Sequence, residues 1–227
     1  LPARPEHEVA VDEADRRTLA RRLSFALTGL PPGPEMVERF AADASPRAYD
    51  DLVQKLLASP HFGEHWARHW MDVVHYADTH GYEWDAPAKN AWRYRDYLIR
   101  AFNADVPFNQ LVLEQIAGDL VEPRIDPRTG VNESLIGPMA LRLGERRHGD
   151  SAQAEGGTQE AITNIIDTVS KSFLGTSVAC AQCHDHKLDA VAQRDYYAMA
   201  GVFMSTRWGV RALDAVDPNV KTLAELR

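Results

Sequence analysis

Both cysteines of this 227-residue chain lie in one pentapeptide, Cys180-Ala-Gln-Cys183-His184. Two cysteines this close together argue against a disulfide framework, so the fold must depend on an apolar core. A hydrophobic content of 44% and five tryptophans are enough to build one. The pattern C-x-x-C-H is itself typical of covalent c-type haem attachment.

The chemistry of haem attachment explains the spacing of these residues. Two thiols, those of Cys180 and Cys183, bond to the two vinyl groups on one edge of a porphyrin, and His184 then lies under the iron as its proximal ligand. We expect Asp185 or a backbone carbonyl to accept the remaining N–H of the His184 ring, because such a bond orients and tunes a ligating imidazole. The sequence thus predicts one covalent haem c in an electron-transfer or redox domain.

Other chemistries share parts of this pattern. A redox-active dithiol is expected in a βαβ setting, which the chain lacks. Two inert core cysteines, or cysteines that staple a loop in a scaffold domain, are a third possibility. A zinc or other metal site in an enzyme module is the main alternative, although adjacent side chains diverge and fit a tetrahedral site poorly. That site would use Cys180, Cys183, His184 and His186 as ligands, with Asp78, Asp119 and Asp185 as acid or base groups.

The charge and hydropathy of the chain argue against some classes of function. The net charge of −8 argues against binding to a nucleic-acid backbone, but it allows a basic redox partner or an adjoining domain of a longer chain. No run of about 18 apolar residues occurs, so no transmembrane helix is expected. The chain begins with Leu1, which indicates a processed protein or a fragment of a longer one. Haem attachment would place it in a periplasm or at the cell surface.

Apolar residues recur at helical spacing along most of the chain. We predict an all-α fold with about eight helices, long loops around the haem site, and no internal repeat. Residues 1–10 are expected to be a flexible lead-in, 11–206 a single helical domain, and 207–227 a linker. The strongest helices are predicted at 12–27, 60–77, 91–103, 158–174 and 193–205, and Gly29 and Gly175 are expected to end the first and fourth of these. In the last, Tyr196, Tyr197, Ala200 and Phe203 are expected to face inward.

The helix predicted at 60–77 supplies the candidate for the second axial ligand. His69 falls on the same face as Phe62, Trp66, Val73 and Tyr76, so it is expected to point inward. It then serves either as the distal haem ligand, giving His/His ligation, or as a buried histidine held by a hydrogen bond. The reserve ligands are His75, His80, Met139 and Met199.

Two arginines and two loops are further candidates. Arg93 and Arg95 lie among aromatic residues and either hold the haem propionates or form a surface ion-pair cluster with Asp96. The loop at 78–90 is rich in aromatic and acidic residues and is either a lid or ligand wall or only a packed connection between helices. The loop at 144–157 has no periodicity and is expected to be mobile, near the site.

Several short motifs occur in a fixed order along residues 15–205. They are Arg21–Pro32, His69-Trp70-Met71-Asp72, Tyr76-Ala77-Asp78, Gly81-Tyr82, Trp92–Asp96, Ala117–Leu120 and Cys180–Lys187. Together they resemble the cytochrome-like domain of unknown function found in large secreted proteins of planctomycetes.

The resemblance implies a secreted helical domain that bears C-x-x-C-H, often next to a small cytochrome c-like domain and a larger uncharacterised one. It implies no particular reaction. The chain departs from the pattern at His75, where an arginine is usual, and at Asp189-Ala190, where Asp-Pro is usual. The first departure makes His75 a candidate particular to this protein, and the second weakens any assignment made for that turn. The roles of His186 and Lys187 stay open, because haem attachment alone does not require these residues.

Overall fold

The computed structural model of the chain describes residues 13–82, 84–147, 156–207 and 209–213. Helices form the whole regular framework of these residues, and no strand occurs among them beyond two isolated bridges. The all-α prediction is therefore confirmed. The chain divides into two compact units, Leu1–Trp66 and Ala67–Arg227, with the division inside helix α4, Pro60–Val73. The expectation of one domain over 11–206 stays a prediction.

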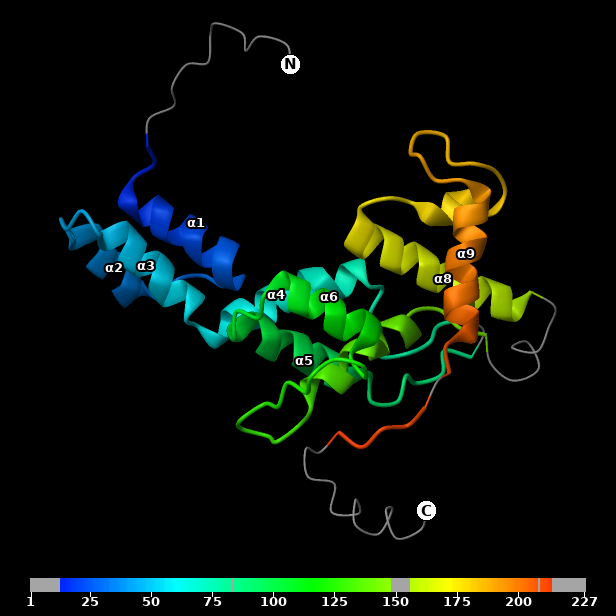
Figure 1. Ribbon diagram of the computed structural model, residues 1–227. Coiled ribbons are helices and arrows are strands. Elements are labelled where there is room, and N and C mark those ends of the chain that lie inside the picture. Colours follow the sequence, from blue (N-terminus) through cyan, green and yellow to red (C-terminus); the bar gives the residue numbers. More distant parts are fainter. Residues whose placement is uncertain (1–12, 83, 148–155, 208, 214–227) are drawn as a thin grey trace, which may run out of the picture. The chain divides into compact units, whose positions relative to one another are not determined.

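The first unit contains α1 (Arg16–Thr28), α2 (Pro34–Ala42) and α3 (Ala48–Leu57), which Figure 1 shows in blue. Asp15 caps α1 by accepting a hydrogen bond from the Thr18 amide at 3.0 Å. The predicted start of this helix, at residue 12, lies outside the described residues. Gly29 ends α1 in the left-handed conformation, as predicted, with φ 69°. The core of this unit consists of Ala20, Phe40, Ala48, Leu52 and Leu56.

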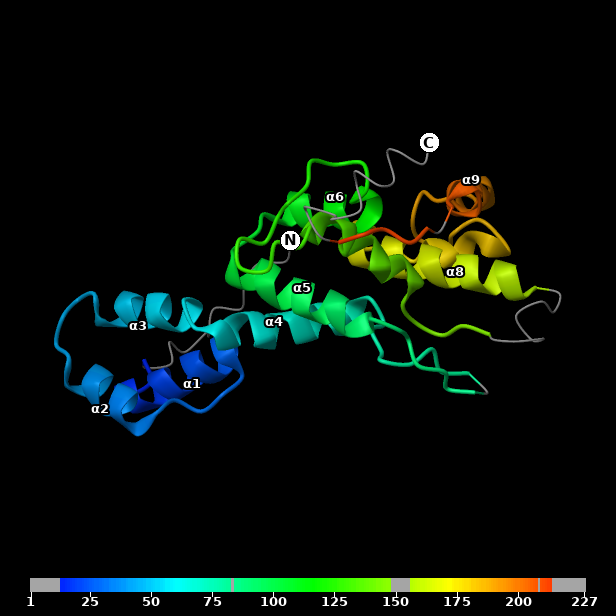
Figure 2. The same ribbon diagram turned by 90° about the horizontal axis from the view of Figure 1, so that it is seen from below.

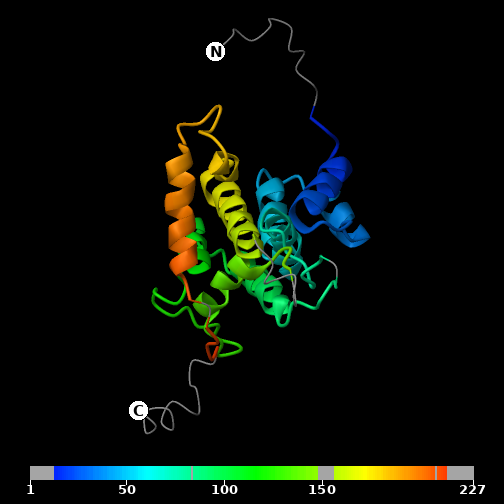
Figure 3. The same ribbon diagram turned by 90° about the vertical axis from the view of Figure 1, so that its right-hand side faces the viewer.

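The second unit has two apolar cores. One lies between the end of α4, α5 (Ala91–Asn103), α6 (Phe108–Ala117) and the short 3₁₀ helices η1 (Glu133–Leu135) and η2 (Gly137–Arg142), as Figure 2 shows for α5 and α6. The other lies between α8 (Gly157–Val169), η4 (Val178–Gln182) and α9 (Gln193–Ser205). In Figure 3, α8 and α9 lie side by side.

Polar side chains are buried in the first of these cores, and each has partners. Gln115 Oε1 accepts hydrogen bonds from the Trp70 indole at 3.0 Å and from the Tyr94 hydroxyl. Glu114 is fully buried, and its carboxylate accepts hydrogen bonds from Arg124 Nε at 2.6 Å and from the Tyr97 hydroxyl at 2.8 Å. Burial by itself raises the pKa of Glu114, but these donors outweigh it and bring that pKa below its usual value. The carboxylate therefore stays charged, and it fixes α6 against α5 and the 124–134 segment.

α4 is shorter than predicted and buries a different face. It ends at Val73 because His75 adopts a left-handed conformation, φ 56°, and the Tyr76 amide bonds back to the Met71 carbonyl at 2.9 Å. The buried positions are Gly63, Ala67 and Val74, whereas Trp66, His69 and Val73 are exposed. The prediction that His69 points inward is therefore wrong. Small residues line the contact face, so the large side chains of this helix gave a misleading apolar stripe.

The backbones of α6 and η2 approach each other without room for a side chain. A Cβ atom added at Gly118 would lie 1.8 Å from the Ser134 carbonyl oxygen, and one at Gly137 would lie 2.4 Å from the Glu114 carbonyl oxygen. Such contacts are far inside van der Waals distance, and backbone atoms cannot rotate away as a side chain can. Glycine is therefore required at both positions, which no pattern of apolar residues reveals.

We predict that Gly118→Ala lowers the free energy of unfolding by about 3 kcal/mol, because the new methyl group forces α6 and η1 apart. Urea unfolding followed by circular dichroism measures the change. Gly201→Ala in α9 is the matched control, since its Cβ would meet no atom within 4 Å. It should stabilise the protein by about 0.5 to 1 kcal/mol. Equal stability of Gly118→Ala and the wild type would contradict the close approach.

Candidate functional site: the Cys180–Asp189 loop

The helix that leads to the cysteines ends in a wide turn. α8 passes at Ser170 into a π-helical turn, η3 (Ser170–Leu174), which Gly175 stops with φ 64°. The sequence predicted one continuous helix to this glycine, so the end is correct and the change of helix type was missed. Turns of this kind occur often at functional sites. Here it redirects the chain into η4.

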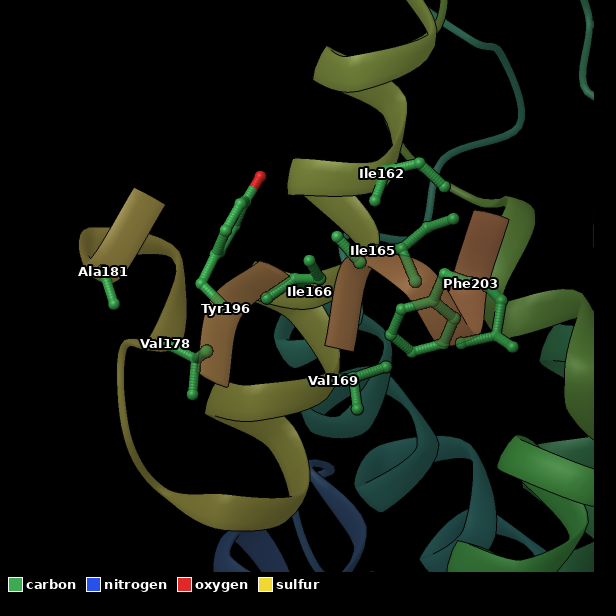
Figure 4. Packing of buried hydrophobic residues seen from close by; sticks show 10 residues of the cluster. Ile162, Ile165, Ile166, Val169, Val178, Ala181, Tyr196 and Phe203 are labelled. Carbon is green, nitrogen blue, oxygen red and sulfur yellow. The ribbon is translucent and has the colours of Figure 1, made fainter. Parts of the chain in front are cut away.

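η4 turns the two cysteines outward by anchoring the residues between and before them. Val178 and Ala181 are buried against Tyr196 and the isoleucines of α8, as Figure 4 shows. A 3₁₀ helix has three residues per turn, so residues three apart share a side. Val178 and Ala181 therefore face the core together, and Cys180 and Cys183 are both exposed as free thiols.

His184 is exposed, and one of its ring nitrogens is held. Nδ1 lies 2.7 Å from the carbonyl oxygen of Asp185. A carbonyl can only accept, so Nδ1 carries the proton and Nε2 keeps its lone pair. This is the orienting bond that the sequence suggested, made by the backbone of Asp185. It prepares Nε2 to act as a metal ligand.

The same loop is tied to the start of α9 by three hydrogen bonds. Asp185 Oδ1 accepts from the Gln193 amide at 2.8 Å, and the Gln182 carbonyl accepts from Gln193 Nε2 at 2.9 Å and from the Tyr197 hydroxyl at 3.3 Å. Asp185 thus serves to fix the loop. Tyr197 is half exposed rather than inward as predicted, because its hydroxyl is used at the loop. Apart from its place at a helix start, nothing in the sequence marks Gln193 as a residue that holds this loop.

His186 folds the turn that follows the cysteines. Its side chain is only 8% exposed, and Nδ1 accepts hydrogen bonds from the amides of Leu188 at 3.3 Å and Asp189 at 2.8 Å. Nε2 therefore carries the proton and lies 3.1 Å from Ser177 Oγ. Both ring nitrogens have partners within the loop, which answers the question that the sequence left open. Lys187 is exposed.

The predicted ligands and acids of the alternative metal site do not converge. His186 uses both nitrogens for hydrogen bonds, Asp185 holds α9, and Asp78 accepts from the Tyr76 hydroxyl at 2.7 Å. Asp119 is exposed beyond the end of α6. Across the described residues, no three His, Cys, Asp or Glu side chains gather as a metal site would require. The geometry thus offers no support for the metal-dependent enzyme module.

The arginines expected to hold propionates lie elsewhere. Arg95 pairs with Asp96 at 2.9 Å, which is the ion-pair alternative. Arg93 stacks its guanidinium over Trp92 at 4.7 Å and lines a cavity together with residues 209–213. That segment follows the C-terminal end of α9, whereas Cys183 and His184 precede its N-terminal end (Figure 1). The 13 residues of α9 separate the two ends by about 20 Å.

The axial-ligand candidates are dispersed as well. His75 forms the end of α4, and His80 and Met139 line the same cavity as Arg93. Met199 packs on the α8–α9 core. His69 is exposed, and its neighbour Trp70 packs against Phe173 with ring centroids 5.8 Å apart. Met199 lies on α9, which contacts η4, and α4, which carries His69, reaches η3 through the contact of Trp70 with Phe173.

The structure describes most of the loop predicted at 78–90 but only part of the loop predicted at 144–157. Residues 78–90 form a turn closed by the pairing of Thr79 with Pro87 and by a bond from the Ala88 amide to the Asp78 carbonyl at 2.8 Å. They contribute to the cavity wall beside Arg93. Residues 148–155 of the second loop lie outside the described residues, so its predicted mobility stays a prediction.

Comparison with known families matches residues 4–208 to the family PSCyt2, described as "Protein of unknown function (DUF1549)". The chain belongs to this family. A domain family of unknown function is what the ordered motifs indicated, and the cytochrome-like character remains to be tested. No curated protein and no solved structure matches the chain. Among the described residues of this PSCyt2 domain, no helix is both long and apolar enough to span a membrane.

We predict that His186→Ala loosens the turn without removing the thiols from the surface. Two backbone amides lose their acceptor, so amide hydrogen exchange at Leu188 and Asp189 should accelerate by about tenfold or more. His186→Asn keeps an acceptor near the position of Nδ1 and should restore part of the protection. His61→Ala, at an exposed histidine of the first unit, is the control. Unchanged exchange in His186→Ala would contradict the proposed bonds.

Proposed function

We propose that this PSCyt2 domain is a c-type haem-binding electron-transfer or redox domain. Haem would be held by thioethers to Cys180 and Cys183, with His184 Nε2 as the proximal iron ligand. When bound, the iron would supply one-electron chemistry, and its second ligand would set the potential. Attachment of this kind belongs to a periplasm or cell surface, and the electron partner would be another protein or an adjoining domain.

The observation that carries the proposal is that structural and reactive residues alternate within the eight residues Val178–Asp185. Val178 and Ala181 anchor η4 in the core, so both thiols can stay exposed on a turn that is fixed from behind. The Asp185 carbonyl orders the His184 ring and leaves Nε2 available. A redox dithiol has no need of this histidine, and a zinc site would need further ligands, which do not gather here among the described residues.

Two large side chains in this region offer carbon surface to a bound group. Leu188, in the same loop, is 85% exposed, and Tyr197 of α9 is 54% exposed. The ring of Tyr197 lies next to Gln182, to whose carbonyl its hydroxyl is bonded. Both side chains therefore belong to segments that flank the two thiols, which is compatible with a porphyrin attached there.

We predict that the protein, produced together with a c-type maturation system and exported, shows a Soret band that survives extraction with acidic acetone. Cys180→Ala and Cys183→Ala should each lose at least one thioether, and the double variant should lose the covalent band altogether, because no other thiol is present. His184→Ala should lower the yield of attached haem sharply. Ser205→Ala is the matched control and should retain the full band. A colourless protein with stoichiometric zinc would refute the proposal.

We further propose His69 as the second axial ligand, although its side chain is exposed rather than inward. The support is its place next to Trp70, which packs on Phe173 seven residues before Cys180. Such a pair of histidines lowers the potential relative to His/Met ligation.

We predict that His69→Ala converts the iron from a low-spin to a high-spin spectrum and raises its potential, because one strong ligand is lost. Absorption and electron paramagnetic resonance spectra measure the change. His61→Ala, a second exposed histidine of the same helix, should leave the spectrum as it is. An unchanged spectrum in His69→Ala would remove this assignment while leaving the covalent attachment intact.

A further inference from the structure

A cavity of about 770 Å³ lies in the second unit, away from the cysteine loop. Its wall is made by residues 86–91 and the first turn of α5, by η1 and η2, and by residues 209–213. The volume falls in the range of small-molecule sites. α9 separates this cavity from Cys183 and His184, so it is a second place where the chain can bind a ligand.

The polar part of the wall is strongly basic. Lys89, Arg93, Arg142 and Arg211 line the cavity, and no Asp or Glu does so among the described residues of the wall. This distribution is notable in a chain whose net charge is −8. The four residues come from three separate parts of the sequence, and the fold brings them together. Such a group creates a local positive potential that attracts anions.

Groups near the cavity wall add to its positive charge. Arg146 follows closely in the chain, and its amide bonds to the His80 carbonyl at 3.0 Å. Burial and the nearby charge of Arg142 lower the pKa of Arg146, as expected where positive charges crowd together. The first turn of α5 contains no acidic residue, so the positive end of that helix adds to the same potential.

The rest of the wall is apolar, and this indicates which class of ligand the cavity can bind. Leu135, Pro138, Met139 and Leu143 contribute carbon surface. The Arg93 guanidinium is held by its contact with the Trp92 ring. A bare inorganic ion would use the arginines and leave the carbon surface unfilled. A ligand with a carbon frame and more than one anionic group uses both.

We propose that this cavity, which we call the basic cavity, binds a small organic polyanion. Carboxylate, phosphate and sulfate groups share the required geometry, because a planar guanidinium bonds two oxygens of each at once. The proposal is independent of haem attachment.

Isothermal titration calorimetry of the full chain at low ionic strength tests the proposal with four probes. Citrate and fructose 1,6-bisphosphate represent the carboxylate and phosphate forms, inorganic phosphate represents the bare ion, and sucrose is the neutral control. We expect at least one of the two organic anions to bind at least tenfold more tightly than inorganic phosphate, and sucrose not to bind. If neither organic anion binds better than inorganic phosphate or sucrose, the proposal is overturned.

Charge-removing variants then locate the binding. Arg93→Gln and Arg142→Gln should each weaken binding of the tighter probe by about tenfold, because each removes a charge-assisted contact. Arg128→Gln, at an exposed arginine outside the cavity, should bind as the wild type does. Lys89→Gln and Arg211→Gln act at exposed side chains and serve if Arg93→Gln fails to fold. Wild-type affinity in all the cavity variants would place the binding elsewhere and overturn the proposal.

Discussion

The second unit depends on one steric constraint, the direct contact of backbone between α6 and the η1–η2 segment. At Gly118 and Gly137 the chain has no room for even one methyl group. This approach carries Glu114 and Gln115 into the core, where they meet Tyr97, Arg124, Tyr94 and Trp70. Buried polar groups of this kind are tolerated only when each has a partner, so the network and the close packing require each other. α5, η2 and the wall of the basic cavity are all fixed through this contact.

The cysteine loop is built on a different principle. Here the core residues Val178 and Ala181 anchor a short turn. The rest of the loop is held by hydrogen bonds that Gln193 and Tyr197 donate and that His186 accepts. The reactive groups Cys180, Cys183 and His184 take no part in the packing. A loop arranged in this way can accept a covalently attached group without rearranging its own support, which is the physical basis for proposing a haem there.

Much of the helical framework follows from local signals. Gly29 and Gly175 end helices because they adopt left-handed conformations, and the isoleucines of α8 and the pair Tyr196 and Phe203 of α9 are buried as their spacing predicts. The prediction failed for α4, where Ala67 and Val74 form the contact and the large residues His69 and Trp66 do not. Periodicity identifies an apolar face of a helix. It does not show which of two faces packs against a neighbouring element, and here the face with small residues does so. Tyr197 shows the same limit, because its hydroxyl has a polar partner far away in the sequence.

The sequence by itself determined the all-α class, the main helix ends and the C-x-x-C-H motif with its three candidate haem residues, because each depends on residues close together in the chain. Only the tertiary structure decided the tasks of His186 and Asp185, the separation of Arg93 from the cysteines, and the gathering of four basic residues around one cavity. The tasks of His186 and Asp185 depend on how a turn folds back on itself, whereas the last two features join segments tens of residues apart. Their positions are set by backbone contacts, such as those at Gly118 and Gly137, that leave no pattern in a single sequence.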